Sequence, residues 1–311
     1  MAYSSGGLIA ATDYNSFANG TNQINQFWNV GSGDAGYGQT ALSAVSASGT
    51  VTATQWSTML NYVNAAAAHQ GISGVGTLGS SITPGVVATY IANLGTAINN
   101  AYSSRLSFAS QGSTTAGTVY GYNPSSGSTA SALGEYSFTR TVAFSSGDAA
   151  RYFFNSGGQL NFVTTGVTNN DSNGRSADLV TLIGTNLGSI SAFRAHSNGG
   201  RSGTSGTLNT NATGIGYYES TVAEKTLVYV TSTSYPYNGD YAKVNVYTSA
   251  QNASGHGDMG STVYIKGIVY LNALQSDFGN KGFNITWNHR IDVVYPESSN
   301  LGNSWGTVTI S

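Results

Sequence analysis

The spacing of apolar residues changes once along the chain, near residue 105, from a helical pattern to a strand-like one. Before that point, three segments that begin near Thr12, Thr54 and Pro84 each carry apolar residues on one helical face. We therefore predict a helical region over residues 1–105 that serves in attachment or oligomerisation. The residues that we expect to pack in this region or to attach it are Tyr14, Phe17, Trp28, Trp56, Leu60 and Tyr90.

From residue 136 to the end, apolar and polar residues alternate with a period of two, which is typical of strands that bury one face. In the segment 284–295, Ile285, Trp287 and Ile291 share one face. The segment 227–230 (LVYV) is continuously apolar, which predicts a strand buried on both faces. Short strands separated by Gly, Asn and Ser predict an antiparallel, jelly-roll-like β-sandwich over 136–311, with one short helix at about 176–187.

The stretch 106–135 has few large apolar residues and is rich in Ser, Gly and Thr, so we expect a linker or surface loop there. The predicted class is therefore α+β, with an N-terminal helical region followed by an antiparallel β-sandwich domain. A chain of 311 residues has room for one large or two ordinary domains.

Charged residues make up only 8% of the chain, against about a quarter in ordinary soluble proteins. Aromatic residues reach 11%, including 20 Tyr, which argues against disorder. A surface of uncharged polar groups and tyrosines suits assembly with further copies, because few charges have to lose their water. It also suits glycan binding, and an ordinary secreted β protein is the third interpretation.

Several classes of partner do not fit this composition. The net charge is −2 and there is no run of basic residues, so we expect no nucleic acid. No apolar run approaches the roughly 18 residues of a membrane span, and the first 15 residues lack the pattern of a signal peptide. Cysteine is absent, which excludes disulfides and thiolate metal sites.

The motifs that could carry chemistry are weak. Residues 31–36 match GxGxxG, but no helical stripe follows them and no Asp or Glu lies between 35 and 134, so we expect a turn and no cofactor. The four histidines are scattered, without zinc spacing. We expect His69 to cap a helix and His289 to be a core or interface histidine. Asp148 and Asp171 lie in turn-like contexts, and the turn at Asp171 lacks the repeated acids of a calcium loop.

Tyrosine-rich segments are the best candidates for contacts. Tyr offers a broad contact area at low entropy cost and a hydroxyl group for hydrogen bonds. Such segments could line a contact between subunits, bind a glycan or simply cover the rim of the core. The candidate subunit or glycan contacts are Tyr217, Tyr218, Tyr235, Tyr237 and Tyr241.

Four segments resemble uncharacterised virion structural proteins of cyanophages and other marine tailed phages. They are ATDYNSFANGTNQINQFWNVGSGDAGYGQ (11–39), TVTATQWSTMLNYVNAAAAHQG (50–71), TRTVAFSSGDAARYFFNSGGQLNF (139–162) and NSWGTVTIS (303–311). Together they cover about a quarter of the chain. The resemblance implies a non-catalytic virion protein whose partners are copies of itself and other virion proteins. It brings no catalytic residues with it.

The position on the particle stays open between tail, baseplate, fibre and head decoration. A receptor-binding protein for host surface glycan is the alternative function. A tailspike-like depolymerase is the third, and no pair of carboxylates in the sequence points to it.

Overall fold

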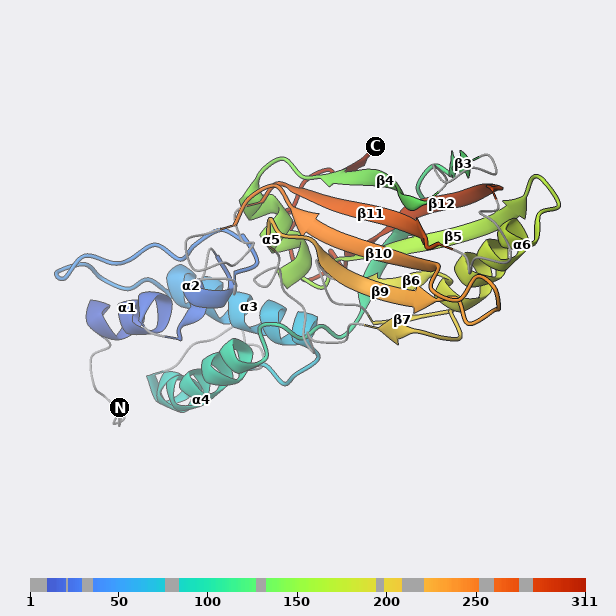
Figure 1. Cartoon of the computed structure of the whole chain (residues 1–311). Coiled ribbons are helices and arrows are strands. Elements are labelled where there is room, and N and C mark those ends of the chain that lie inside the picture. The colour runs from blue at the N-terminus through green and yellow to red at the C-terminus, as the bar shows by residue number, and fades with distance from the viewer. Residues whose placement is uncertain are drawn as a thin grey trace.

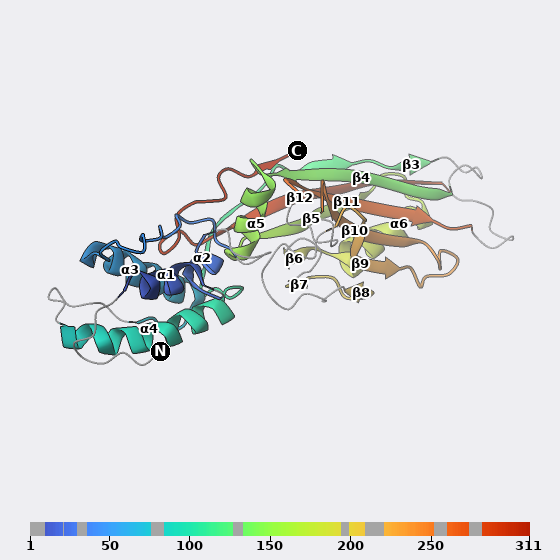
Figure 2. The same cartoon turned by 90° about the vertical axis from the view of Figure 1, so that its left-hand side faces the viewer.

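A computed structural model describes residues 10–20, 22–29, 36–75, 84–126, 133–193, 199–208, 221–251, 260–273 and 282–311, with the backbone alone at 84–92, 192, 193 and 208. The described chain is elongated, with helices gathered at one end and two β-sheets at the other (Figures 1 and 2). The helical end comprises α1 (Ala11–Asn19), α2 (Ile24–Phe27), α3 (Ala53–Gln70) and α4 (Pro84–Ser103).

The first predicted helix is broken into α1 and α2. Gly20 leaves the helical conformation, with φ −70° and ψ 176°, and its N–H bonds back to the carbonyl of Ser16. The second predicted helix is α3, and it begins one residue earlier than Thr54. Thr52 is its N-cap, and Thr52 and Gln55 exchange hydrogen bonds as a capping box. The third predicted helix is α4, which begins at Pro84 as expected.

The helices enclose a hydrophobic cluster of their own. Its side chains come from α1 to α4 and from residues 36–51, and the C-terminal segment adds Leu301. The largest fully buried members are Tyr14, Phe27 and Tyr37. Every residue of this cluster except Leu301 precedes residue 105, so the helical region builds its core from nearly contiguous sequence.

Two antiparallel sheets form the other end. The first runs in the order β1 (Gln111–Thr115), β12 (Phe283–Pro296), β5 (Gln159–Asn169), β6 (Ile190–Phe193) and β7 (Gly200–Arg201), and β2 (Tyr120–Tyr122) and β3 (Ser125–Ser126) also pair with β12. The second runs β13 (Thr309–Ile310), β4 (Gly134–Ala143), β11 (Thr262–Leu271), β10 (Tyr241–Thr248), β9 (Lys225–Thr231) and β8 (Thr207–Leu208). The stretch 106–135, expected as a linker or surface loop, thus supplies three short strands to the first sheet.

The two sheets face each other across one shared hydrophobic cluster. Phe138 of β4 meets Trp287 of β12, with ring centroids 5.2 Å apart, and Phe162 of β5 at 6.4 Å. The predicted α+β class with a sandwich of antiparallel sheets is confirmed. The finer, jelly-roll-like description is not established, because β9, β10 and β11 follow one another as a meander. The strand 227–230 is also not buried on both faces, since Tyr229 is 37% exposed.

Two helices complete the sandwich. The predicted helix near 176–187 is α6 (Gly174–Val180), continued as the π-helix η2 (Thr181–Leu187). It contacts β5 and β12 of one sheet and β9 and β10 of the other, so it fills the space between them. The second helix, α5 (Gly147–Asn155), corrects the interpretation of Asp148 as a turn residue. Ser146 caps it, and Phe153 and Phe154 bury its apolar face at the end of the sandwich nearest the helical region (Figure 1).

Candidate contact surfaces and the joint between the two regions

The predicted N-terminal packing or attachment residues lie inside the helical region. Tyr14, Phe17, Trp28 and Leu60 are buried. Half-buried Trp56 makes edge contacts with Tyr14 and Phe17, with ring centroids 5.8 and 6.4 Å apart. These side chains therefore stabilise the helical core and do not form an outer attachment surface. The side chain of Tyr90 lies outside the described residues.

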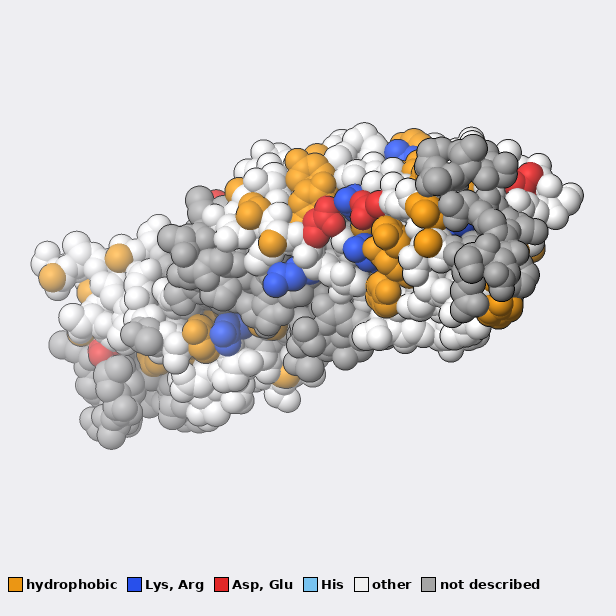
Figure 3. All heavy atoms as spheres, in the orientation of Figure 1, with side chains coloured by type: hydrophobic (Ala, Val, Ile, Leu, Met, Phe, Trp, Pro, Cys, Tyr) orange, Lys and Arg blue, Asp and Glu red, His pale blue; other side chains and the backbone are white. Residues whose placement is uncertain are grey.

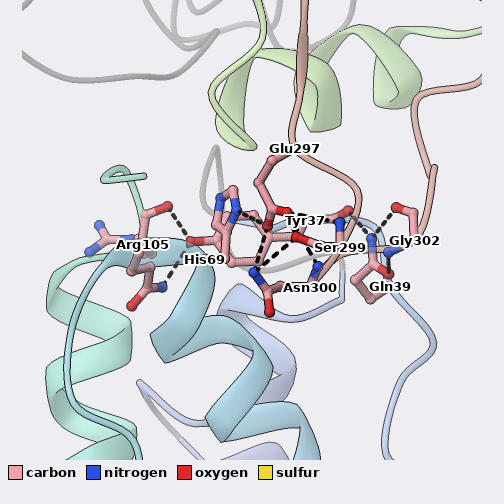
Figure 4. A network of polar contacts seen from close by, with 9 residues as sticks. Tyr37, Gln39, His69, Arg105, Glu297, Ser299, Asn300 and Gly302 are labelled. Carbon is pink, nitrogen blue, oxygen red and sulfur yellow. Dashed lines mark hydrogen bonds and ion pairs between the residues drawn. The ribbon is translucent and has the colours of Figure 1, made fainter. Parts of the chain in front are cut away.

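The joint between the helical region and the sandwich centres on His69 and Glu297 (Figure 4). His69 lies at the end of α3, and its Nδ1 is 3.1 Å from Oε1 of Glu297, which directly follows β12. The backbone N–H of Ser299 and the amide of Asn300 also donate to this carboxylate, at 2.8 and 3.0 Å. The expected helix cap is thus a buried histidine that pairs with a carboxylate 228 residues away.

The environment fixes the charge of both partners. Burial alone would raise the pKa of Glu297, but the hydrogen bonds from Ser299, Asn300 and His69 lower it to about 2. Burial lowers the pKa of His69, and Glu297 offsets only part of this effect. At neutral pH, a neutral His69 therefore donates its Nδ1–H to an ionised Glu297.

A second layer of polar contacts surrounds this pair. The hydroxyl of Tyr37 donates to the carbonyl of Arg105 and accepts from Nε2 of Gln70, both at 2.8 Å. Burial raises the pKa of Tyr37, which keeps the phenol protonated. The side-chain amide of Gln39 exchanges two hydrogen bonds with the backbone of Gly302, at 2.8 and 2.9 Å. The C-terminal segment is thereby tied to the helical region.

Helix α5 adds a third set of contacts to the joint. The amide of Asn155 donates to the carbonyl of Gly36 at 3.0 Å. Gly38 has φ +70° and lies so close to Tyr152 that a Cβ placed on it would be 2.3 Å from the ring. These contacts link the helical region to the sandwich through α5 as well as through the C-terminal segment.

The outer side of the second sheet presents a dense group of tyrosines, which we call the tyrosine face. On this face, acidic (red) and basic (blue) side chains lie between two hydrophobic patches (orange) over β11, β10 and β9 (Figure 3). Tyr241 stacks on Tyr270 with ring centroids 4.7 Å apart, and Tyr229 lies 5.1 Å from Tyr241. The members of the face are Tyr229, Tyr241, Tyr247, Tyr264, Tyr270, Lys243, Lys266, Glu135 and Glu224.

A loop at the far end of the sandwich, residues 232–240, carries two more of the predicted contact residues. Tyr235 is 60% exposed, and Tyr237 is half-buried. Asp240 anchors the loop through a buried ion pair with Arg175 of α6, in which the two N–O distances are 2.8 and 2.6 Å. Tyr241, the residue after the loop, belongs to the tyrosine face. Tyr217 and Tyr218 lie outside the described residues.

His289 is a core histidine, in agreement with the expectation. Its ring stacks on Phe138 with centroids 3.8 Å apart, and Nε2 accepts a hydrogen bond from Nε of Arg140 at 2.9 Å. Burial, with a contribution from the nearby Arg140 charge, lowers its pKa to about 4. His289 is therefore neutral and fully engaged in the core.

The described residues hold no group of three or more His, Asp or Glu side chains placed to bind a metal ion. Asp171 takes part in a local turn, where its carboxylate accepts from the N–H of Asn173 at 2.9 Å. Residues 31–35 of the GxGxxG motif lie outside the described part of the chain. None of the helices in that part combines the length and the apolar character that a membrane crossing needs.

Comparisons of the chain with protein-family models, with curated proteins and with solved structures give no match.

Tyr241 is the one residue of the tyrosine face that is also among the contact residues predicted from the sequence. Tyr247 along β10 and Tyr264 and Tyr270 along β11 alternate with buried residues, so the sequence contains a signal for one tyrosine-bearing side. No such pattern predicts the joint, because the residues around Glu297 in the sequence do not indicate a contact with His69.

Proposed function

We propose that the chain is a non-catalytic structural component of a tailed bacteriophage particle, present in several copies on the tail, baseplate or fibre or as a head decoration. The resemblance of four segments to phage virion proteins supports this function. The observation that carries it is the joint, where a buried His69–Glu297 pair and its neighbours hold the two regions in one fixed orientation.

A fixed joint is what a particle component needs. A protein that presents one region at a set distance from a particle loses that geometry if its two regions move independently. Here the C-terminal segment returns from β12 to contribute Leu301 to the helical core, and then runs back to pair β13 with β4. The chain thus crosses the joint again after the sandwich is nearly complete, which resists bending.

The test is the composition of purified particles. Mass spectrometry and immunogold labelling of gradient-purified particles, from the phage whose genome encodes the chain, should detect it at one defined position. A non-structural protein of the same phage serves as the control for contamination. Finding the chain free in the lysate and missing from particles would overturn the proposal.

A shortened chain tests the role of the helical region. A phage that carries only residues 106–311 should assemble particles without this protein, because the proposal assigns attachment to residues 1–105. The shortened chain exposes Leu301, so the additional change Leu301→Ser should keep it in solution. Incorporation of this shortened protein at the normal level would contradict the assignment.

A second candidate function, recognition of host surface glycan, is favoured by Tyr235. This tyrosine is 60% exposed on a loop that lies at the opposite end from the helical region and is anchored by Arg175 and Asp240. Binding of the full chain to purified host polysaccharide should weaken on Tyr235→Ala and should not change on Val119→Ala, a residue 50% exposed elsewhere. Equal binding by both variants would remove this candidate.

A further inference from the structure

We propose that the tyrosine face is the surface through which two copies of this chain meet. This inference deepens the proposed function, on which it rests, because it names the contact between copies.

The stacking of the rings favours a protein partner. Tyr241 and Tyr270 stack with an interplanar angle of 6°, and Tyr247 and Tyr264 stack at 19°, both pairs at 4.7 Å. Each stacked ring covers one of its flat faces with its neighbour, which leaves less open ring face for a ligand. A sugar ring that stacks on an aromatic residue needs an open ring face. Rows of hydroxyl groups at strand spacing suit a flat protein surface better.

The charged groups of the tyrosine face favour a second copy of the same chain. Nζ of Lys266 lies 3.0 Å from Glu135 and 3.2 Å from Glu224, so this trio carries one net negative charge. Lys243 extends over the ring of Tyr241, with Nζ 5.5 Å from the centroid, and provides one positive charge elsewhere on the face. A two-fold axis that passes between Lys243 and the acidic trio would bring Lys243 of each copy toward the trio of the other. The face is therefore complementary to itself, as a contact between identical chains requires.

The outer side of the first sheet differs from the tyrosine face. Along β12, the side chains that alternate with the buried Ile285 and Trp287 are Asn284, Thr286 and Asn288. Its neighbour β5 also places no tyrosine on that side. Among the described residues, the second sheet alone concentrates on its outer side the residue type that is enriched in protein contacts. The difference marks the second sheet as the contact side.

The size of the face sets the expected strength. Four strands about 4.8 Å apart and about eight residues long cover roughly 500 Å², so two copies would bury roughly 1,000 Å². This is the lower limit for a specific contact, which predicts a weak dimer in solution. Many such contacts on one particle would act together.

The test is analytical ultracentrifugation of the full chain over a concentration range from about 1 to about 200 µM. The wild type should show a concentration-dependent equilibrium between monomer and dimer. The double variant Tyr229→Ser, Tyr241→Ser should raise the dissociation constant at least about tenfold. Tyr235→Ser changes a more exposed tyrosine outside the face, so it should leave the equilibrium unchanged.

Hydroxyl-radical footprinting of the wild type provides a readout that does not depend on the folding of variants. Tyr229 should become protected as the protein concentration rises, whereas Tyr235 should not. Any one of three results would overturn the inference. The chain could stay monomeric at the highest concentration, or the double variant could leave the oligomer intact. The third is protection of Tyr229 that appears only with added host polysaccharide. If the chain is monomeric but is found in particles, this inference is overturned and the proposed function stands. If the chain forms a dimer through this face but is missing from particles, the inference stands and the proposed function is overturned.

Discussion

The helical region and the sandwich fix their loops with different chemistry. Residues 1–105 contain three of the 24 charged residues (Asp13, Asp34 and Arg105), and the remaining 21 lie in 106–311. In the helical region, side-chain amides hold the backbone of residues 36–51. Asn15 exchanges hydrogen bonds with Val45 at 2.7 and 2.8 Å, and Asn25 does the same with Leu42 at 2.9 Å.

In the sandwich, an ion pair fixes a loop. Arg175 and Asp240 fix the loop 232–240 to α6, and the carbonyl of Asn272 also accepts from Arg175. An amide clamp has no charge to titrate and little to screen, whereas a buried ion pair depends on both partners being present and ionised. The comparison therefore predicts that the amide clamps of the helical region contribute independently of pH and salt, whereas the buried ion pair of the sandwich is sensitive to the loss of either charge.

The largest effect should come from Arg175→Met. The change leaves the carboxylate of Asp240 buried without its cation, which should lower the free energy of unfolding by about 3–5 kcal/mol. Urea unfolding measures it. Asp148→Ala is the matched control, because it also breaks an Arg–Asp pair, but Asp148 is 64% exposed and the loss should stay below about 1 kcal/mol. Similar losses of unfolding free energy in both variants would show that the buried pair contributes no more to stability than the exposed one.

The next effect should appear on acidification. The pKa of His289 is about 4 in the folded chain, and its ordinary value is 6.5. Below pH 6.5, the unfolded chain therefore binds a proton at this residue that the folded chain does not bind. The contribution of neutral His289 to the free energy of unfolding is complete above pH 6.5. It is lost by pH 4, which lowers the free energy of unfolding by roughly 2–3 kcal/mol. His69 acts in the same direction, and Glu297 adds a loss between pH 4.5 and about 2. The raised pKa of Asp178 opposes them in part.

Thermal unfolding between pH 7.5 and 4 measures this dependence. His289→Gln keeps an acceptor for Arg140 and removes the titration, so its stability should fall less steeply with pH than that of the wild type, even if it starts lower. A variant with the same slope as the wild type would place the acid sensitivity elsewhere.

Periodicity predicts those parts of the fold whose neighbours are close in sequence. The stripe of α3 and the alternation of β12 follow directly from which residues are apolar. The break at Gly20 was not predicted because the apolar stripe continues on both sides of this glycine. Helix α5 was not predicted because Asp148 was interpreted as a turn residue, although Ser146 and the apolar residues at 149, 150, 153 and 154 form a short capped helix.

The candidate surfaces required pairing information that the sequence does not contain. Tyr241 stacks on Tyr270 only because β10 and β11 pair in the register that sets these residues opposite each other. A shift of one residue would place the two tyrosines on opposite sides of the sheet. The His69–Glu297 contact depends on where the chain goes after β12, which no local pattern specifies.

A smaller effect should follow from removing an amide clamp. Asn15→Ala deletes both hydrogen bonds to Val45 and should cost about 1–2 kcal/mol, because a part-buried N–H and carbonyl lose their partner. The cost should be the same at pH 7.5 and pH 5, unlike that of any change at His289. Asn61→Ala, on the exposed side of α3, is the control and should be nearly neutral. A clamp whose cost depends on pH would break the contrast between the two regions.

The smallest effects come from two helix caps, and they show whether the regions unfold together. Thr52 accepts from the N–H of Gln55 at the start of α3, and Ser146 accepts from the N–H of Ala149 at the start of α5. Thr52→Ala and Ser146→Ala should each cost about 1 kcal/mol, so each variant is the control for the other. If the joint transmits stability, both changes shift one shared calorimetric transition by the same amount, because every contact across His69 and Glu297 must break before either region unfolds. Two transitions, each moved by one variant only, would show instead that the joint sets the orientation of the regions without coupling their stability.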